Sequence, residues 1–303
     1  MWQAAGMRTP SCPPWPRAAP LLRSLALVAL LGVPPLLAAA RAWASGPSVV
    51  EPLSVSALAA AIAEYDRGAQ LPLPRLTDAQ RTALIRGEVV RVLDQPGGDP
   101  DEPRRATGLR VIPAPRDVVW VACQDPHYVQ SGEVTEVRVE FAPPDRSRWY
   151  GLLDLPRPFA DRHWLVDVTN NHSLAASSGN RAWEHPWRLR AGGEAELGPL
   201  VAAGRLAKIP PEVVAEAVWT PVNHGAWLVI ALDPEHTLLG YHATSVVGGA
   251  IPEGLITRFV HATLGGMLEA VAERAVHKVR AHYVAGHKAV IGGDGRPVGH
   301  FGG

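Results

Sequence analysis

The chain has 303 residues, of which 47% are hydrophobic and 19% are charged. This composition suits a globular protein with a sizeable core and excludes a polar disordered chain. The 29 basic and 29 acidic residues cancel, so we expect no nucleic-acid partner. With only two cysteines, the chain can form neither a disulfide framework nor a zinc site of the CxxC type.

The first 44 residues have the organisation of a secretory signal. They contain four arginines and no acidic residue, and the apolar run at 21–33 precedes the small-residue pattern Ala42-Trp43-Ala44. Two prolines end the run well short of the ~20 residues that a spanning helix needs. We therefore expect export, to the periplasm or out of the cell, with cleavage near Ala44. A retained membrane anchor is the alternative.

We divide the rest of the chain into three parts. Residues 45–81 form an N-terminal extension, with a helical stretch at 54–66 and a second helix starting at Thr77. Residues 82–285 form one domain, interrupted by an exposed loop at 95–103 that is rich in proline and glycine. The Gly-rich tail, residues 286–303, is expected to be flexible.

Alternation of apolar and polar residues predicts several strands in the domain. In the stretch 137–141, for example, Val137, Val139 and Phe141 share the apolar side. Further strands are predicted at 84–93, 106–112, 149–153, 164–169, 183–189, 213–220, 226–232 and 237–246. A hairpin turn is predicted at 223–225. Because the strands follow one another without long helices between them, we expect antiparallel pairing.

Two helices interrupt this pattern, a short one that begins at Pro115 and a long one from Pro252 to about Tyr283. The apolar side of the long helix comprises Ile256, Val260, Thr263, Leu264, Met267, Val271 and Ala275. This stripe predicts that the helix packs on the sheet. The pair Gly265-Gly266 is interpreted as a local bend, with a hinge for ligand access as the alternative.

Cys123 and three histidines near the C-terminus are candidates for a catalytic thiol and for metal ligands. Cys123 follows an apolar stretch, which predicts a small core residue rather than a catalytic thiol. His277, His282 and His287 recur at intervals of five, which would spread them around one continuous helix. They are therefore interpreted as a basic helix end that complements the helix dipole, and no metal site is expected.

Three stretches of the domain resemble a known family. The first, at 111–120, is an apolar strand followed by Ala-Pro and Val-Trp. The second, at 155–164, has proline and then Arg-His before a strand, and the third, at 248–252, leads into the last helix. In this order they are similar to START-type lipid-transfer domains and to the wider superfamily of polyketide cyclases, coenzyme-Q-binding proteins and plant pathogenesis-related ligand carriers. The family often has Arg-Asp where this chain has Arg162-His163.

The resemblance implies an α+β helix-grip fold, in which a curved antiparallel sheet wraps around a long C-terminal helix and leaves an internal apolar cavity. It implies a partner that is a lipid or another apolar small molecule, which the protein binds or transfers without a cofactor. The protein is expected to be a monomer that makes at most transient contact with a membrane.

Strand parity places Arg162 on the same side as Trp164 and Val166, so its guanidinium projects to the apolar side of the sheet. There it either anchors a ligand or forms an internal ion pair. The residues expected to line the cavity are Arg162, Trp164, Val166, Trp183, His185, Trp187, Trp227, Tyr241, Val260, Thr263, Leu264, Met267 and Val271. A gate loop is expected at Gly248, Gly249, Ile251 and Pro252.

Motifs for nucleophilic, metal-dependent and phosphate-binding enzymes are absent from the sequence. We therefore assign no catalytic residue and favour a carrier over an enzyme. Two alternatives remain. One is a cavity enzyme of the cyclase or aromatase type, which would use Arg162 or His185 as an acid or electrostatic stabiliser. The other is a cell-envelope interaction protein whose cavity is filled by its own side chains.

Overall fold

The computed structural model describes residues 53–98, 102–128, 134–142, 145–248 and 253–302. The expected signal sequence and its cleavage site lie outside these residues. The first two helices are α1 (Val55–Asp66) and α2 (Asp78–Ile85). Ser54 caps α1 by accepting the Ala57 N–H, and Thr77 forms a capping box with Gln80 at the start of α2. No helix of the described part is long and apolar enough to cross a membrane.

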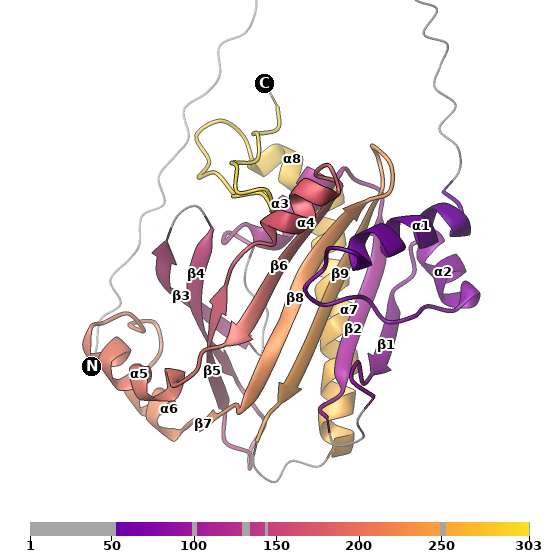
Figure 1. Cartoon of the computed structure of the whole chain (residues 1–303). Coiled ribbons are helices and arrows are strands. Elements are labelled where there is room, and N and C mark those ends of the chain that lie inside the picture. The colour runs from indigo at the N-terminus through magenta and orange to yellow at the C-terminus, as the bar shows by residue number, and fades with distance from the viewer. Residues whose placement is uncertain (1–52, 99–101, 129–133, 143–144, 249–252, 303) are drawn as a thin grey trace, which may run out of the picture. The chain divides into compact units, whose positions relative to one another are not determined.

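Within the described residues, nine strands form one curved sheet (Figure 1). The strands are β1 (Val90–Asp94), β2 (Arg105–Ile112), β3 (Val134–Ala142), β4 (Arg146–Leu153), β5 (Arg162–Val168), β6 (Ala182–Leu189), β7 (Val218–Trp219), β8 (Val222–Ala231) and β9 (Thr237–Val246). Their order across the sheet is β1-β2-β9-β8-β6-β5-β4-β3. All neighbours on this path pair antiparallel, as predicted, and only the two-residue β7 runs parallel beside β5.

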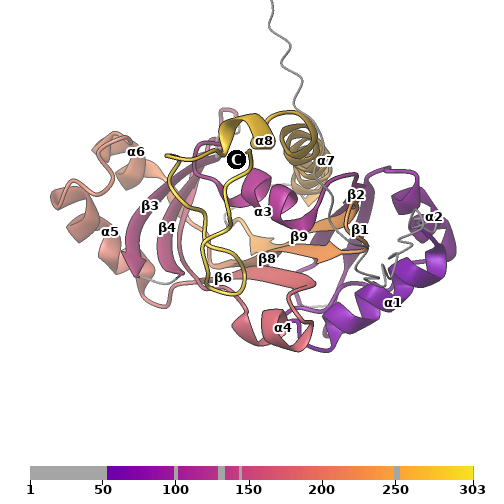
Figure 2. The ribbon, with the colours of Figure 1, turned by 90° about the horizontal axis from the view of Figure 1, so that it is seen from above.

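The helices lie on both sides of the sheet. Figure 2 shows the concave side covered by α3 (Arg116–Gln124), α7 (Glu253–His277) and α8 (Val279–His282). The opposite side carries α1, α2 and α4 (His172–Ser177), and α5 (Gly193–Ala202) and α6 (Pro211–Glu216) lie beyond the β3–β5 half of the sheet. A long C-terminal helix held in the curve of an antiparallel sheet is the helix-grip arrangement. The predicted α+β fold is therefore confirmed.

The pairing register shows which side chains face the concave side. A Cβ on Gly108 would lie 2.8 Å from Cδ1 of Leu268 on α7, so this position of β2 faces the helix. Gly108 pairs with Tyr241, Tyr241 with Trp227, and Trp227 with His185. Directly opposed residues of neighbouring strands share a face. We call this face, with every second residue of each strand, the inner face.

The outer face packs against the N-terminal helices. Leu58 and Tyr65 of α1 share a cluster of buried side chains with Leu109 of β2 and Leu228 of β8. The residues expected to form a separate extension thus share a hydrophobic core with the sheet.

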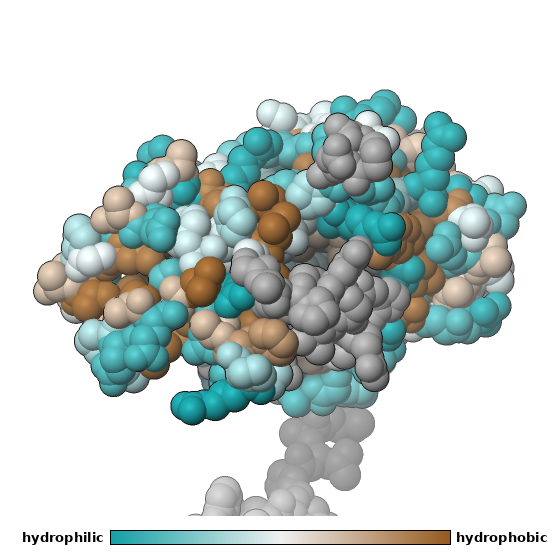
Figure 3. All heavy atoms as spheres, turned by 90° about the horizontal axis from the view of Figure 1, so that it is seen from below, coloured by the Kyte–Doolittle hydropathy of each residue, from teal (hydrophilic) through white to brown (hydrophobic). Residues whose placement is uncertain are grey.

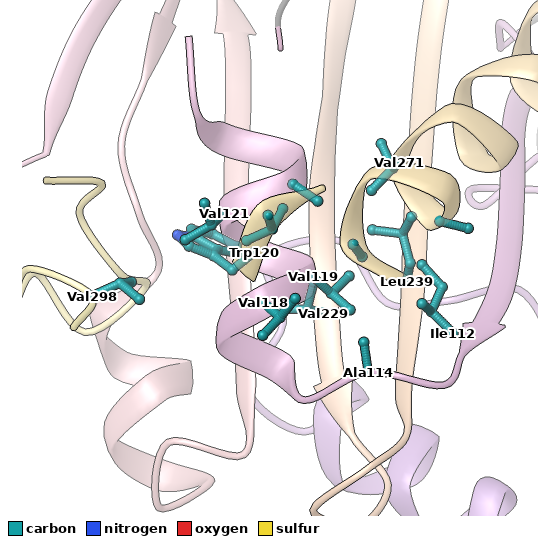
Figure 4. Packing of buried hydrophobic residues seen from close by; sticks show 14 of the residues in the cluster. Ile112, Ala114, Val118, Val119, Trp120, Val121, Val229, Leu239, Val271 and Val298 are labelled. Carbon is teal, nitrogen blue, oxygen red and sulfur yellow. The ribbon is translucent and has the colours of Figure 1, made fainter. Parts of the chain in front are cut away.

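The C-terminal half of α7 packs directly on the inner face and on α3. Val271 lies against Ile112 and Leu239 of the sheet and Val119 of α3, in one cluster of buried side chains (Figure 4). This packing agrees with the predicted apolar stripe of the long helix. It fills the inner face around Ile112 and Leu239, so an internal space can lie only elsewhere on this face.

Two predicted elements are wrong in the β7–β8 region. Residues 213–220 form most of α6 and then β7 instead of one strand, because Pro210 and Pro211 start a helical turn. The predicted hairpin turn at 223–225 lies inside β8. Gly225 is required there for a different reason, since a Cβ would lie 2.4 Å from the Trp187 ring.

The C-terminal segment is packed, so the prediction of a flexible tail from residue 286 is wrong. Val290 and Val298 are buried in the α3–α7 cluster (Figure 4). The Tyr283 hydroxyl accepts the Val290 N–H and donates to the Val298 carbonyl, and Trp120 Nε1 donates to the Ile291 carbonyl. Glycine content suggested mobility, but the apolar residues between the glycines bury their side chains.

The interpretation of the C-terminal histidines holds in part, since His277 and His282 lie in the basic last turns of α7 and α8, but the placement of all three on one continuous helix is wrong. The long helix breaks at Lys278, α8 ends at His282, and the chain turns through Gly286, which has φ +96°. His282 and His287 therefore do not lie on one helix. Their side chains meet, with 3.1 Å between the two Nε2 atoms.

Candidate functional site

Five aromatic side chains of the inner face remain partly exposed although they point into the curve of the sheet. We call them the aromatic belt: Trp149, Trp164, Trp187, Trp227 and Tyr241. They come from β4, β5, β6, β8 and β9, and thus from most of the width of the sheet. Fully packed cores leave no accessible surface on such residues. Packing therefore does not cover these five side chains completely.

Contacts within the belt hold its rings in place. The Tyr241 ring lies 5.2 Å from Trp187 and 4.7 Å from Trp227. Trp187 Nε1 donates a 2.9 Å hydrogen bond to Asn223 Oδ1, and Trp149 Nε1 donates to Ser147 Oγ. The polar atoms of these two tryptophans are thereby satisfied. What the belt presents to the interior is mainly aromatic carbon.

Glu136 on β3 adds a carboxylate to the same face. It pairs with Gly151, which in turn pairs with Trp164 of the belt. Its side chain is accessible, and within the described residues it forms no ion pair. Surrounding protein nevertheless removes much of its hydration, which raises the pKa of this carboxyl. Glu136 is therefore a polar group inside an aromatic surface.

Tyr241 and Cys123 both interact electrostatically with Glu136. Burial raises the pKa of Tyr241, and the negative charge of Glu136 raises it further. Burial likewise raises the pKa of the Cys123 thiol, which interacts with both Arg274 and Glu136. Cys123 packs against the core as expected, and its protonated thiol is a poor nucleophile.

His185 lies on the inner face next to the belt. Its Nδ1 is 2.5 Å from Oδ1 of Asn170, whose Nδ2 donates to the Gly292 carbonyl. Asn170 Oδ1 is therefore the acceptor, Nδ1 carries the proton, and Nε2 has a lone pair. Burial lowers the pKa of His185 to about 4, so the imidazole is neutral near neutral pH.

Arg162 lies on the inner face, where its parity placed it, with 4% of its surface exposed. The sequence left open whether it anchors a ligand or pairs with an acid. Instead, its Nε donates to the Val247 carbonyl, Nη2 to the Gly248 carbonyl and Nη1 to the Ala160 carbonyl. The guanidinium thus holds the chain at the end of β9, where the expected gate loop begins.

Other residues expected to line the cavity are part of the core. Trp183 is 3% exposed, packs 5.2 Å from Trp120, and lies beneath Gly293. Val166, Leu264 and Val271 are also buried. Thr263 and Met267 keep partial exposure. The Val260 side chain and the residues Gly249, Ile251 and Pro252 lie outside the described part of the structure.

Sequence reasoning missed Glu136 and Trp149. The alternation at 137–141 identified a strand, but Val137 and Val139 pack outward on the cluster around α5 and α6. A register shift between Arg138 and Glu140 places Phe141 on the inner face. The sequence signal was the charged residues that alternate with the valines. Charged side chains have no role on an outer face that packs on a core, so this alternation indicated that they face inward.

Two hollows on the outer surface do not belong to this site. One of about 290 Å³ is lined by residues between α5 and α6, and one of about 300 Å³ lies over β3, β4 and β5 among charged side chains such as Arg148 and Asp167. Seen from below, the molecule shows hydrophobic groups on the α5 and α6 side, interrupted by hydrophilic ones (Figure 3). Neither hollow is lined by the aromatic belt.

The fold and the belt define a helix-grip protein with an aromatic inner face. No family model and no curated protein matches the chain. Solved structures that are similar to it include a STAR-related lipid transfer protein from Xanthomonas axonopodis (18% identity, TM-score 0.44, covering 62% of this chain and 99% of that one). Human StAR-related lipid transfer protein 5 gives 14% identity, TM-score 0.45 and coverages of 73% and 96%.

An aromatase/cyclase named Zhui from a Streptomyces species is also similar, with 16% identity, TM-score 0.37 and coverages of 59% and 96%. These likenesses are distant. The fold stated above rests on the chain's own strand order and pairing, and the function proposed below rests on its own residues.

Proposed function

We propose that the protein binds a lipid or another apolar small molecule inside the curve of its sheet. The observation that carries this proposal is the aromatic belt, whose rings face inward and still keep accessible surface. Covering such surface is favourable by about 25 cal/mol per Å². A ligand that buries about 400 Å² of apolar surface would gain on the order of 10 kcal/mol before the costs of ordering it.

Glu136 and Tyr241 supply the polar end of this site. The carboxylate has no partner among the described residues, and the loss of hydration near the surrounding protein raises its pKa although the side chain is accessible. A ligand group that donates a hydrogen bond, such as a hydroxyl or an amine, would satisfy it. The favoured ligand is therefore an amphiphile with an apolar body and a hydrogen-bond donor group. The donor group would lie near β3, and the apolar body would lie along the aromatic belt.

Access is proposed to occur at the end of β9. Arg162 binds the carbonyls of Val247 and Gly248, the residues that lead toward the expected gate loop. Gly248 has φ +67°, a conformation that other residues rarely adopt. We infer that this pair of hydrogen bonds keeps one side of the opening fixed while the ligand passes.

We also propose that the protein acts outside the cytoplasm. The support is the sequence of residues 1–44, with its basic start, apolar run and small residues before position 45. Cells that produce the full chain should contain a mature form whose first residue lies close to position 45, as N-terminal sequencing would show. An uncleaved chain in the membrane fraction would support the retained anchor instead.

The test of ligand binding is extraction and mass spectrometry of protein purified without detergent. The proposal expects an amphiphile at close to one molecule per chain, absent from a sample that was unfolded and refolded without lipid. The refolded sample should then take up a fluorescent fatty amine or alcohol. Failure to recover any amphiphile, together with no uptake of either probe, would contradict the proposal.

A second candidate is an enzyme that uses Glu136 as an acid or base. A carboxyl with a raised pKa beside a tyrosine on an apolar surface is a common arrangement for proton transfer. The variant Glu136→Gln distinguishes the two functions. A carrier would keep binding the apolar body of the ligand with altered headgroup preference, whereas an enzyme would bind the ligand and lose its conversion.

A further inference from the structure

A buried carboxylate and two imidazoles, none of them part of the aromatic belt, meet where α3, α8 and the C-terminal segment join (Figure 1). Asp125 ends α3 and its side chain is 2% exposed. His282 is the last residue of α8, and His287 follows the turn at Gly286. One ligand atom from each of these three side chains lies within 4.8 Å of the others.

The distances between these atoms suit a tetrahedral metal ion. Nε2 of His282 and Nε2 of His287 are 3.1 Å apart, and Oδ2 of Asp125 is 3.3 Å from Nε2 of His287. Zinc binds nitrogen and oxygen ligands at ~2.0–2.2 Å, so in a tetrahedral site its ligand atoms are roughly 3.3 Å from one another. Two of the three separations are close to this value, and the third, between His282 and Asp125, is at most 4.8 Å.

The hydrogen bonds around the cluster leave one buried carboxylate oxygen without a hydrogen-bond partner and orient the facing nitrogen of His287. Asp125 Oδ1 accepts the His127 N–H, but Oδ2 is buried and has no hydrogen-bond partner in the described structure. His287 Nδ1 is 2.8 Å from the Lys288 carbonyl and must donate to it. A neutral His287 therefore directs its Nε2 lone pair toward the oxygen lone pairs of Asp125, a contact that a cation between them makes favourable.

Neighbouring groups hold the ligands in position, as outer contacts do in metal sites. The His127 ring stacks 3.9 Å from that of His282. Tyr283 packs 5.1 Å from His287, and its hydroxyl is fixed by Val290 and Val298. The Lys288 carbonyl selects the tautomer of His287 that can bind a metal through Nε2.

We propose that Asp125, His282 and His287 bind one divalent transition-metal ion, with zinc as the best fit. Two imidazoles and one carboxylate suit zinc better than calcium or magnesium, which prefer sets of oxygen ligands. Three described side chains leave the fourth position to water or another ligand. The ion would join α8 and the C-terminal segment to the end of α3 and so stabilise that end of the fold.

The test is metal binding by the untagged full protein, with Zn²⁺ competing against a chromophoric chelator and Co²⁺ as a spectroscopic probe. The proposal expects one ion per chain and, with Co²⁺, the strong visible absorption of a tetrahedral site. Loss of even an outer partner of a ligand weakens binding by about tenfold or more. His282→Gln, His287→Gln and Asp125→Asn should therefore each weaken Zn²⁺ binding by at least about tenfold.

His277→Gln is the matched control, because His277 is exposed at the end of α7 and outside the cluster. It should bind Zn²⁺ as the wild type does. Asp125→Asn keeps Oδ1, which accepts the His127 N–H, and so remains interpretable if a histidine variant unfolds. Zn²⁺ should raise the melting temperature of the wild type but not of Asp125→Asn. Absence of Zn²⁺ binding by the wild type, or equal binding by all four variants, would overturn the proposal.

Discussion

Two glutamates on opposite faces of the same sheet show how differently the faces are built. Glu184 on the outer face is 0% exposed and accepts hydrogen bonds from the Tyr65 hydroxyl, the Gln70 and Leu71 N–H groups and the Asn171 amide. Glu136 on the inner face is accessible and forms no ion pair within the described structure.

This difference between the two glutamates indicates that the outer face serves stability and the inner face serves function. On the outer face, the polar network of Glu184 joins α1 and the segment after it to β6, so every group is used by the fold itself. On the inner face, the carboxylate and the aromatic belt keep surface that the fold does not use. Unused polar and aromatic surface inside a curve is where a ligand gains most from binding. We therefore expect outer-face changes to affect folding and inner-face changes to affect binding.

The largest effect is expected at Glu184. Glu184→Leu would remove the carboxylate that four donor groups share, and only the Tyr65 hydroxyl and the Asn171 amide have a second acceptor. We expect a cost of about 3–5 kcal/mol of unfolding free energy. Denaturant unfolding followed by circular dichroism would measure this loss. Glu235→Ala, at an exposed position of the turn between β8 and β9, is the control and should cost far less. An equally small cost for both would contradict the assigned role of Glu184.

Filling the inner face should remove binding with little cost in stability. Ala243 on β9 is partly exposed on the inner face, opposite Gly225 and Ala106. In a closed core, Ala243→Phe would cost about 1–3 kcal/mol through overpacking. If the space is open, the phenylalanine enters it, stability changes by less than that range, and uptake of a fluorescent fatty alcohol is lost. A large destabilisation with no change in uptake would show that the space is already filled.

Acid should destabilise the fold through two histidines. Burial lowers the pKa of His242 to about 3 and of His185 to about 4, from 6.5. Between these values the unfolded chain binds more protons, so stability is greatest above pH 6.5 and falls as the pH falls. Each histidine contributes a slope of at most about 1.4 kcal/mol per pH unit.

His242→Leu isolates the larger of these two contributions. Both ring nitrogens of His242 are buried without hydrogen-bond partners in the described structure, so the variant should be at least as stable as the wild type at neutral pH and should show a flatter profile in acid. The profile comes from denaturant unfolding at a series of pH values. His277→Gln, at an exposed position, should leave the slope unchanged. A slope that is equally steep in both variants would contradict this assignment.

A smaller effect is expected at Arg162. Arg162→Gln removes charged hydrogen bonds to the Val247 and Gly248 carbonyls, each worth about 1.5–3 kcal/mol when fully buried. Because glutamine can restore one of them, we expect a net loss toward the lower end of that range and faster release of a bound fluorescent lipid. Arg188→Gln, on the exposed outer side of β6, is the control. Unchanged release in Arg162→Gln would show that the arginine does not control access.

The sequence allowed the fold to be predicted well but the site only in part. The alternation of apolar and polar residues predicted the antiparallel sheet, and the apolar stripe of the last helix predicted that α7 packs on it. Both predictions depend only on local periodicity. Parity also placed Arg162 inward. Its carbonyl partners could not be predicted, since Val247 is far away in the sequence and carbonyls carry no sequence signal.

The remaining errors have similar physical causes. Trp183 and Trp187 lie on one face of β6, but the C-terminal segment covers only Trp183, a contact between regions far apart in the chain. Glu136 was missed because Val137 and Val139 pack outward on the cluster around α5 and α6, so the polar residues that alternate with them face inward. His282 and His287 come together only because the helix ends between them, at a position that helical periodicity does not reveal.

The most direct test of the central claim is quenching of tryptophan fluorescence by a lipid with a brominated chain, which quenches on contact. We expect strong quenching in the wild type, a clear reduction in its extent in Trp187→Phe and Trp227→Phe, and no reduction in Trp183→Phe, whose ring is packed beneath the C-terminal segment. Absence of quenching in the wild type, or an equal reduction in all three variants, would contradict binding along the aromatic belt.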